Sequence, residues 1–283
     1  MNSVKLSFEF FPPRSDAQER RFWMTLGCLQ TLDPIYMSMT WGALGTTSDV
    51  SLEVLKALST DATVPVAAHL TCVGQTAESI RETIRQFDEL GITRFVALRG
   101  DALRSQMPEN GLEHASELVA ILAEDGRRDI SVAAYPEQHP ESKDSKDDLH
   151  WLKHKLEAGA QRAITQFFFE PDTFLRFRDN AVRAGIDKPL IPGILPIHNI
   201  AKVQQFSQQC GASVPTSLIE RFTGVSDAET RERYSVEHSV ALCESLQREG
   251  VDEFHIYTLN QSSLSYQVSK ALLGNTHKIH AAA

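Results

Sequence analysis

The sequence predicts an α/β fold of the (β/α)8 or TIM barrel class. Eight short apolar runs with strand character alternate with stretches whose apolar residues recur at the helical period. The length of 283 residues suits one barrel of this class. A doubly wound parallel sheet is the alternative, but no GxGxxG turn and no GxxxxGK[S/T] loop follows any of the predicted strands.

The predicted elements follow one another from residue 5 to residue 260. The predicted strands cover residues 5–11, 35–40, 64–72, 93–100, 130–136, 162–169, 190–196 and 253–260. The predicted helices cover residues 16–32, 51–60, 77–90, 114–125, 147–159, 171–185, 199–211 and 228–250. Because the sequence contains no low-complexity linker, we expect one domain over residues 1–275. A disordered tail is expected over residues 276–283.

The composition is that of a soluble globular protein, with 42% hydrophobic and 23% charged residues. The net charge of −9 disfavours a nucleic-acid partner, because an acidic surface repels phosphate backbones. The apolar runs are too short to cross a membrane, and the amino terminus lacks the layout of a signal peptide. The four cysteines are widely spaced, so we expect reduced thiols and a cytoplasmic location.

Polar groups are found where the predicted strands end, which is where active sites lie in barrels of this class. The residues at these ends are Glu9, Thr40, His69, Arg99 with Asp101, Tyr135 with His139, Gln166 and Tyr257. The cation Arg99 is suited to hold a phosphate or to pair internally, and both readings stay open. Since barrel mouths are generally polar, each of these residues also fits a plain solvated rim.

Glu9 interrupts an otherwise apolar strand. Strand alternation places Phe8 and Phe10 on one face and Glu9 on the other, so Glu9 points into the barrel mouth when the two rings face the helices. A poorly solvated carboxyl has a raised pKa and is able to donate a proton near neutral pH. An ion pair with Arg99 or Arg162 lowers that pKa instead, and the sequence leaves both alternatives open.

His150 and His154 lie four residues apart, as a metal-binding pair on a helix does. A zincin helix carries Glu directly after its first histidine, and this chain has Trp151 there. We therefore interpret the two histidines as part of a solvated helix face and predict no metal site.

Seven motifs together resemble the bacterial methylenetetrahydrofolate reductase family. In chain order they are SFEFFPPR, AHLTC, ALRGD, SVAAYPEQHPE, RAITQFFF, IPGILPI and FHIYTLN. The resemblance implies a (β/α)8 barrel that binds FAD without a Rossmann turn. It implies reduction of 5,10-methylenetetrahydrofolate to 5-methyltetrahydrofolate, with NADH or NADPH as electron donor in a ping-pong scheme that supplies methionine synthesis. It further implies homo-oligomers, either dimers or tetramers.

The resemblance also implies roles for individual residues. Glu9 matches the general acid that protonates a folate nitrogen. Asp101 matches an acid that contacts the pterin and lies near the flavin pyrimidine. Gln166 matches an amide that contacts folate and nicotinamide in turn, and Phe206 matches an aromatic residue that stacks on either substrate.

Further contacts follow from the same resemblance. FAD contacts are implied for Trp41, Ala43, His69, Arg99, Gly100, Asp101, Ala115, Tyr135, His139, Asp148 and Lys155, with a nicotinamide contact for Thr40. Substrate contacts are implied for Asp101, Gln166, Lys202, Phe206, Tyr257 and Gln261. Taken without the resemblance, Asp148 and Lys155 fit a plain surface pair on a helix.

The chain departs from the family pattern at several of these positions. Trp41 stands where the pattern has Tyr, and Trp151 and His154 replace polar and basic residues on the helix that faces the FAD phosphates. We therefore expect FAD affinity to depend on pH. Gln261 stands where an Arg is expected, and we expect Lys202 to supply the missing charge toward the glutamate tail of folate.

Two other functions fit the same residues. A folate-dependent transferase or acid–base lyase would use Glu9 and Asp101 on the same barrel without a redox step. A non-catalytic folate or flavin carrier would bind the ligand without turnover.

Overall fold

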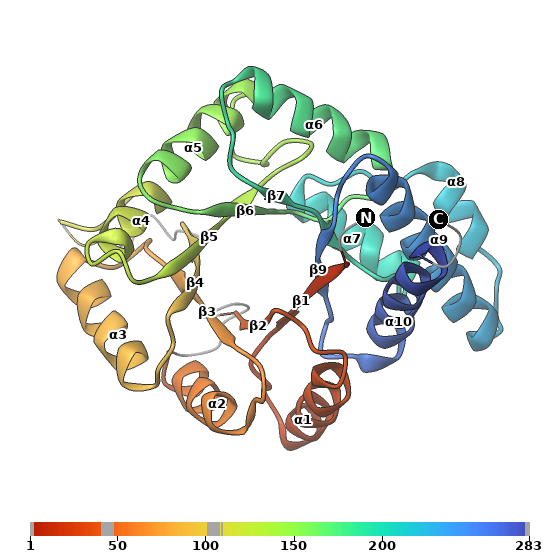
Figure 1. The fold of residues 1–283 in the computed structure, drawn as a ribbon, viewed down its shortest axis with the longest axis horizontal. Coiled ribbons are helices and arrows are strands. Elements are labelled where there is room, and N and C mark those ends of the chain that lie inside the picture. Colours follow the sequence, from red (N-terminus) through yellow and green to blue (C-terminus); the bar gives the residue numbers. More distant parts are fainter. Residues whose placement is uncertain (1–2, 41–47, 101–107, 109, 281–283) are drawn as a thin grey trace.

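The computed structural model describes residues 3–40, 48–100, 108 and 110–280. In these residues the strands form one parallel sheet in the order β7-β6-β5-β4-β3-β2-β1-β9-β8. β7 (Leu190–Ile191) and β8 (Gly193–Ile194) are two parts of one run of chain. β7 pairs with β6 and β8 pairs with β9, so this run closes the sheet on itself. The predicted (β/α)8 barrel class is confirmed (Figure 1).

The elements alternate along the chain as the sequence predicts. The other strands are β1 (Lys5–Phe10), β2 (Tyr36–Met39), β3 (Val66–Thr71), β4 (Arg94–Leu98), β5 (Asp129–Ala134), β6 (Arg162–Thr165) and β9 (Glu253–Tyr257). The helices are α1 (Asp16–Gln30), α2 (Ser48–Asp61), α3 (Ala77–Glu89), α4 (Ala115–Ala123), α5 (Ser145–Glu157), α6 (Pro171–Arg183), α7 (Ile200–Cys210), α8 (Thr216–Phe222), α9 (Ala228–Arg248) and α10 (Ser262–His280).

Two helices, α8 and α10, are additional to those predicted from the sequence. α10 packs against both α1 and α9, so it closes the ring of helices around the barrel in Figure 1. Its residues Leu264, Val268 and Leu272 recur at four-residue spacing and are all buried. α7 and α8 lie in the connection from β8 to α9.

The apolar face of β1 packs outward, as alternation predicts. Phe8 and Phe10 are fully buried in the main core, and the ring of Phe10 meets that of Phe22 on α1 edge to face at 5.6 Å. Each such burial contributes about 2 kcal/mol to stability. The outward packing of the phenylalanines directs Glu9 to the barrel interior.

The amino-terminal end of the barrel interior contains ion pairs. Asp129 pairs with Arg94 at 3.1 Å and with Arg162 at 2.6 Å. The guanidinium of Arg94 also lies over the Tyr36 ring, 5.5 Å from its centroid. Arg162 is therefore engaged away from the mouth, and the expectation that it pairs with Glu9 is wrong.

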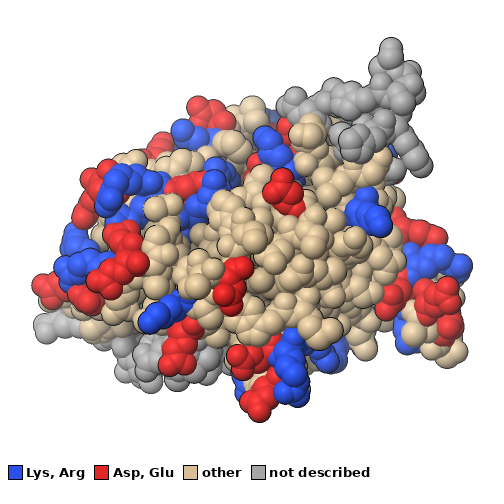
Figure 2. Space-filling view, turned by 60° about the horizontal axis from the view of Figure 1, so that its bottom comes forward, with Lys and Arg blue, Asp and Glu red and all other residues tan. Residues whose placement is uncertain are grey.

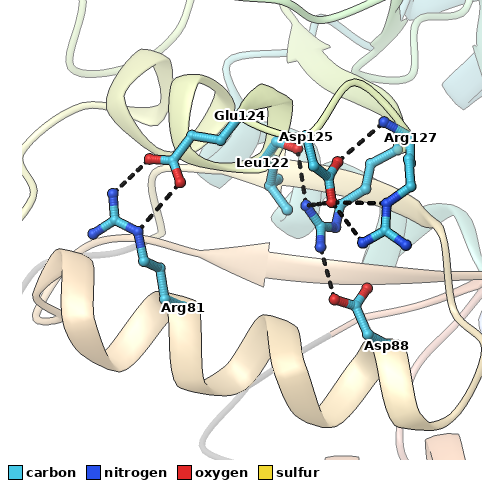
Figure 3. Close-up of polar contacts among 7 residues, drawn as sticks. Arg81, Asp88, Leu122, Glu124, Asp125 and Arg127 are labelled. Atoms are coloured by element: carbon cyan, nitrogen blue, oxygen red, sulfur yellow. Dashed lines mark hydrogen bonds and ion pairs between the residues drawn. The ribbon is translucent and has the colours of Figure 1, made fainter.

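A second ion-pair network joins α3 to the turn between α4 and β5 (Figure 3). The side chain of Arg128 is 8% exposed and binds Asp88 at 2.7 Å and Asp125 at 2.8 Å. Arg81 pairs with Glu124 beside it at 2.5 Å, but both of those side chains are about half exposed. Arg128 therefore makes the pairs of this network that are least screened by water.

The surface mixes charges of both signs. On the face drawn in Figure 2, basic and acidic side chains lie beside one another along the margins, and a broad uncharged area lies between them. Within the part of the chain that the structure describes, every helix is too short or too polar to span a membrane.

Candidate active site at the barrel mouth

Glu9 lies near the carboxyl end of β1, beside Ser38 of β2 and Tyr257 of β9 in the register of the sheet. Its side chain is 22% exposed. Its Oε2 atom faces two imidazoles, with Nε2 of His255 at 3.4 Å and Nε2 of His69 at 3.5 Å. The structure therefore brings together a carboxyl group and two histidines from three different strands.

The two histidines decide the ionisation of Glu9. Burial alone raises the pKa of the carboxyl, but His69 and His255 together lower it below its usual value. The expected raised pKa is therefore wrong for the protein without ligands. The alternative of a lowered pKa for Glu9 is correct in direction. The groups that lower it are the two imidazoles, and not Arg99 or Arg162.

His69 itself is held in its neutral form. Burial lowers the pKa of His69 to about 4, and the neighbouring Glu9 only partly opposes this shift. Among the described residues its Nε2 atom has no hydrogen-bond partner within bonding geometry. This imidazole is therefore an available polar group inside the mouth at neutral pH.

His255 is part of a chain of polar contacts that the sequence analysis missed. Ser7 Oγ lies 2.7 Å from Nδ1 of His255, and both residues are fully buried. The signal was present in the alternation, because Ser7 shares the inward face of β1 with Glu9 and His255 shares that of β9 with Tyr257. Recognising the pair also requires the register between β1 and β9, where Ser7 stands opposite His255.

The turn after β9 fixes the end of β1. Thr258 donates its hydroxyl to the carbonyl oxygen of Glu9 at 2.6 Å. The Asn260 side chain accepts from the Phe11 amide at 3.1 Å and donates to the Phe11 carbonyl oxygen at 2.7 Å. These contacts hold the backbone from the Glu9 carbonyl to Phe11, and Thr258 and Asn260 were not among the predicted site residues.

Aromatic rings form one wall of the mouth. Tyr257 donates its hydroxyl to the carbonyl oxygen of Thr165 at 2.8 Å, and its ring passes over Gly193. A Cβ at Gly193 would lie 2.2 Å from that oxygen and 2.6 Å from the Tyr257 ring, so this position requires glycine. Phe206 is 40% exposed and stacks on Phe167 at 5.5 Å.

Gln166 lies beside this wall at the end of β6. Its side-chain oxygen accepts from the Phe167 amide at 3.1 Å. A small hollow next to it is lined by Tyr135, Phe167 and Cys210. The predicted site residues Tyr135, Gln166, Phe206 and Tyr257 thus belong to one region of the mouth.

Arg99 follows β4 and is held by two contacts. It pairs with Glu141 at 2.6 Å and donates to the carbonyl oxygen of Glu113 at 3.3 Å. Its side chain is 43% exposed, so it has an internal partner and also faces solvent. Gly100 has φ +84, and a Cβ there would lie 2.9 Å from Thr71, which favours glycine.

Asp148 and Lys155 on α5 do not form the plain surface pair that the sequence fits when taken without the resemblance. Asp148 accepts from the His139 amide at 2.9 Å and from the Ser142 hydroxyl, so it orders the loop after β5. The Lys155 amine donates to the carbonyl oxygen of Ala133 at 2.6 Å. Burial lowers the pKa of Lys155 to about 8, although Asp148 partly opposes this shift.

Aromatic side chains cluster between the start of α4 and the middle of α5. Trp151 is 36% exposed and stacks on His114, which caps α4, with ring centroids 4.2 Å apart. The rings of His150 and His154, on the same helix, have their centroids 4.4 Å apart. Ala115 is the buried first residue of α4, next to this cluster.

The remaining predicted residues are more peripheral or are not described. The Thr40 hydroxyl is buried and has no hydrogen-bond partner among the described residues. Lys202 is exposed on α7, four residues before Phe206, and the Gln261 amide donates to the Thr258 carbonyl oxygen at 2.9 Å. The three predicted residues Trp41, Ala43 and Asp101 lie outside the described residues.

The fold and the mouth define an α/β-barrel protein with a carboxyl–imidazole cluster at the carboxyl ends of its strands. The family model described as "Methylenetetrahydrofolate reductase" matches residues 1–273, and the chain belongs to this family.

Named relatives agree with this assignment. The chain is 42% identical over 273 residues to the 5,10-methylenetetrahydrofolate reductase of Pectobacterium carotovorum subsp. carotovorum, covering 95% of this chain and 90% of that protein. It is also 42% identical over 271 residues to the enzyme of that name from Escherichia coli (strain K12), with the same coverage.

A solved structure supports the fold alone. It is an uncharacterised protein from Clostridium thermocellum whose description states that it binds two copies of 5-methyl-5,6,7,8-tetrahydrofolic acid. Its TM-score is 0.69 at 18% identity, and the match covers 98% of this chain and 96% of that one.

Proposed function

We propose that this protein is an FAD-dependent reductase that converts 5,10-methylenetetrahydrofolate to 5-methyltetrahydrofolate, with NADH or NADPH as electron donor. The observation that carries the proposal is Glu9, a partly exposed carboxyl held between His69 and His255 at the barrel mouth. The names of the relatives at 42% identity support the substrate and the reaction. In this scheme the two substrates react in turn at one face of the cofactor and supply methyl groups for methionine synthesis.

The residues around α5 fit the phosphates of FAD. Among the described residues the Lys155 amine makes one hydrogen bond, to Ala133, and it has further N–H groups to donate. Arg99 follows β4 and is 43% exposed, and Gly100 allows close approach of the backbone. Two cations and a glycine turn are a suitable setting for a pyrophosphate.

Other FAD contacts follow the same assignment. They are Trp41, Ala43, His69, Asp101, Ala115, Tyr135 and His139, and Thr40 is assigned to nicotinamide. The buried polar atoms of Thr40 and His69 that have no hydrogen-bond partner among the described residues favour a polar ligand in the mouth. When bound, FAD supplies hydride acceptance from the nicotinamide and hydride donation to folate.

Glu9 acts in this scheme as the general acid. It protonates a nitrogen of the five-membered folate ring as the ring opens to an iminium, which is the hydride acceptor. The pKa of Glu9 is lowered while its side chain is partly exposed to water at the barrel mouth. A bound pterin excludes water from the exposed part of the side chain and so strengthens burial, which raises the pKa.

The aromatic wall provides the substrate contacts. Phe206 stacks on the flat ring of either substrate, while Gln166 and Tyr257 supply polar contacts beside it. Lys202 lies one helical turn from Phe206 on α7. In the proposed scheme it binds the glutamate carboxylates of folate. Asp101 and Gln261 complete the proposed substrate contacts. A homo-oligomer, either dimer or tetramer, and a cytoplasmic location stay predictions.

The experiment that tests the proposal is a visible spectrum of the purified protein under anaerobic conditions. We expect a yellow protein that bleaches with NADH or NADPH and recolours when methylenetetrahydrofolate is added. A colourless protein that takes up no added FAD would contradict the proposal and favour a folate-dependent transferase or lyase.

A further inference from the structure

We propose that Ser7 and His255 are positioning residues that assign the two oxygens of Glu9 to different tasks. Oε2 is held by the barrel, and Oε1 carries the proton that is donated. This inference rests on the proposed function, because it concerns how Glu9 acts as an acid.

The two oxygens of Glu9 have different surroundings. Both imidazoles approach Oε2, with His255 at 3.4 Å and His69 at 3.5 Å. Oε1 makes no hydrogen bond or ion pair to the described residues, and it is absent from the buried, unpartnered polar atoms. Oε1 is therefore the oxygen that an incoming ligand meets.

The carboxylate of Glu9 selects the tautomer of neutral His255, and the Ser7 hydroxyl completes it. If Nδ1 carried the hydrogen and donated to Ser7, the lone pair of Nε2 would face the lone pairs of an ionised Oε2. The stable arrangement has the Ser7 hydroxyl donating to Nδ1 and the Nε2–H donating to Oε2. The chain of donation runs from Ser7 through His255 to Glu9.

The imidazole ring of His255 is fixed from both sides. The Tyr36 ring stacks on it at 6.0 Å, and the Tyr257 ring meets it edge to face at 5.4 Å. Among the described residues, the titratable groups near Glu9 and His255 are His69 from β3, Tyr36 from β2, and Glu253 and Tyr257 from β9. Of these groups, only His69 and His255 contact Oε2.

This arrangement has a chemical consequence. A proton on Glu9 resides on Oε1, because Oε2 already accepts a hydrogen bond. During transfer the Oε1–H bond breaks, the proton joins the folate nitrogen, and the electrons of the cleaved C–N bond stay on that nitrogen. Glu9 becomes a carboxylate, and the Nε2–H of His255 stabilises the new charge.

The test is an infrared titration of Glu9 in the protein without substrates, with Glu9→Gln subtracted to assign the carboxyl signal. We expect His255→Leu to raise the pKa of Glu9 by about one unit, because a hydrogen bond to the charged form is lost. His255→Gln, which retains an N–H donor, restores part of the shift. Ser7→Ala raises the pKa by a smaller amount, because Nδ1 loses its donor.

Ser38→Ala is the matched control. Ser38 is a fully buried serine beside Glu9 on β2, and among the described residues its hydroxyl donates only to the Phe8 carbonyl oxygen, at 3.5 Å. We expect the titration of Glu9 to be unchanged in this variant. An unchanged titration in Ser7→Ala, or in both His255 variants, would overturn the proposal, and Ser7→Ala keeps the test available if His255→Leu does not fold.

A second readout separates this inference from the proposed function. In Ser7→Ala, bleaching by the nicotinamide donor keeps its rate, while the pH profile of the recolouring step shifts upward with the pKa of Glu9. A protein that never bleaches contradicts the proposed function, yet the infrared titration still decides the roles of Ser7 and His255.

Discussion

Nε2 of His255 lies 3.4 Å from Oε2 of Glu9, although the two residues are 246 positions apart in the chain. Closure of the barrel produces this contact, because β9 pairs with β1 in parallel and sets Ser7 opposite His255. The acid at the mouth is therefore assembled only when the last strand has joined the first. Contacts between chain segments so far apart form late in folding when they depend on closing a large loop.

The Gly193 position predicts a steric effect on the aromatic wall. Gly193→Ala forces a Cβ against the Thr165 carbonyl oxygen and the Tyr257 ring, so we expect a loss of about 2 kcal/mol in the free energy of unfolding. Urea unfolding measures this loss. The matched control is Gly27→Ala on α1, where a Cβ has nothing within 4 Å, and which is expected to stabilise by about 0.5 kcal/mol. Equal stability of the two variants would contradict the steric account.

The network of Figure 3 predicts unequal roles for two arginines. Arg128→Ala leaves Asp88 and Asp125 without their least exposed partner. We therefore expect the free energy of unfolding to fall by about 3 kcal/mol. Arg81→Ala removes a pair that is open to water and is expected to change stability little. Thermal and urea unfolding of both variants measure the difference, and a larger loss for Arg81→Ala would refute this ranking.

Buried histidines predict acid sensitivity. Burial lowers the pKa of His238 to about 4, with Arg221 adding to the shift, and Nε2 of His238 is buried with no hydrogen-bond partner among the described residues. As the pH falls below 6.5, the unfolded chain binds a proton that the folded chain binds only near pH 4. Stability is therefore lost between these two values as the pH decreases.

Two glutamine variants test this source of acid sensitivity. His238→Gln should make the dependence of the unfolding free energy on pH between 6.5 and 4 less steep by the contribution of one histidine, while buried His69 keeps its own contribution. His150→Gln, on the exposed face of α5, should leave that dependence as it is. If the unfolding free energies of His238→Gln and of the unmodified protein depend on pH in the same way, His238 is ruled out as the source of the acid sensitivity.

Lys155 predicts the strength and pH dependence of FAD binding under the proposed function. Lys155→Met removes a charged hydrogen-bond donor from α5, so we expect the dissociation constant for FAD to rise about tenfold. Because the pKa of Lys155 lies near 8, affinity for FAD should fall as the pH rises past that value. Fluorescence of released flavin measures both effects.

Lys153→Met provides the comparison for Lys155, because Lys153 lies on the same helix and donates to the Ala184 carbonyl oxygen at 3.1 Å. This variant is expected to retain the FAD affinity of the unmodified protein. Similar flavin release from both methionine variants would argue against a specific role for Lys155.

Much of the fold and part of the site could be predicted from the sequence. Alternation in β1 placed Phe8 and Phe10 outward and Glu9 inward because the side-chain period of a strand is fixed. The rule that active sites lie at strand ends then located Gln166 and Tyr257 at the same end of the barrel as Glu9. Both inferences depend only on local pattern and on the barrel class.

The partners of these residues could not be predicted in the same way. Arg162 pairs with Asp129 because the two face each other across β5 and β6 at the opposite end of the barrel. Asp148 serves the loop after β5 because His139 and Ser142 fold back onto it. Such pairings depend on register and loop geometry, which alternation does not specify.

The most direct test of the account compares Glu9→Gln with the unmodified protein in the two half-reactions under anaerobic conditions. We expect both proteins to bleach with NADH or NADPH at similar rates. The variant should then recolour at least about a hundredfold more slowly with methylenetetrahydrofolate, because the proton donor is absent. Recolouring of Glu9→Gln at the rate of the unmodified protein would contradict the role of Glu9 as the acid.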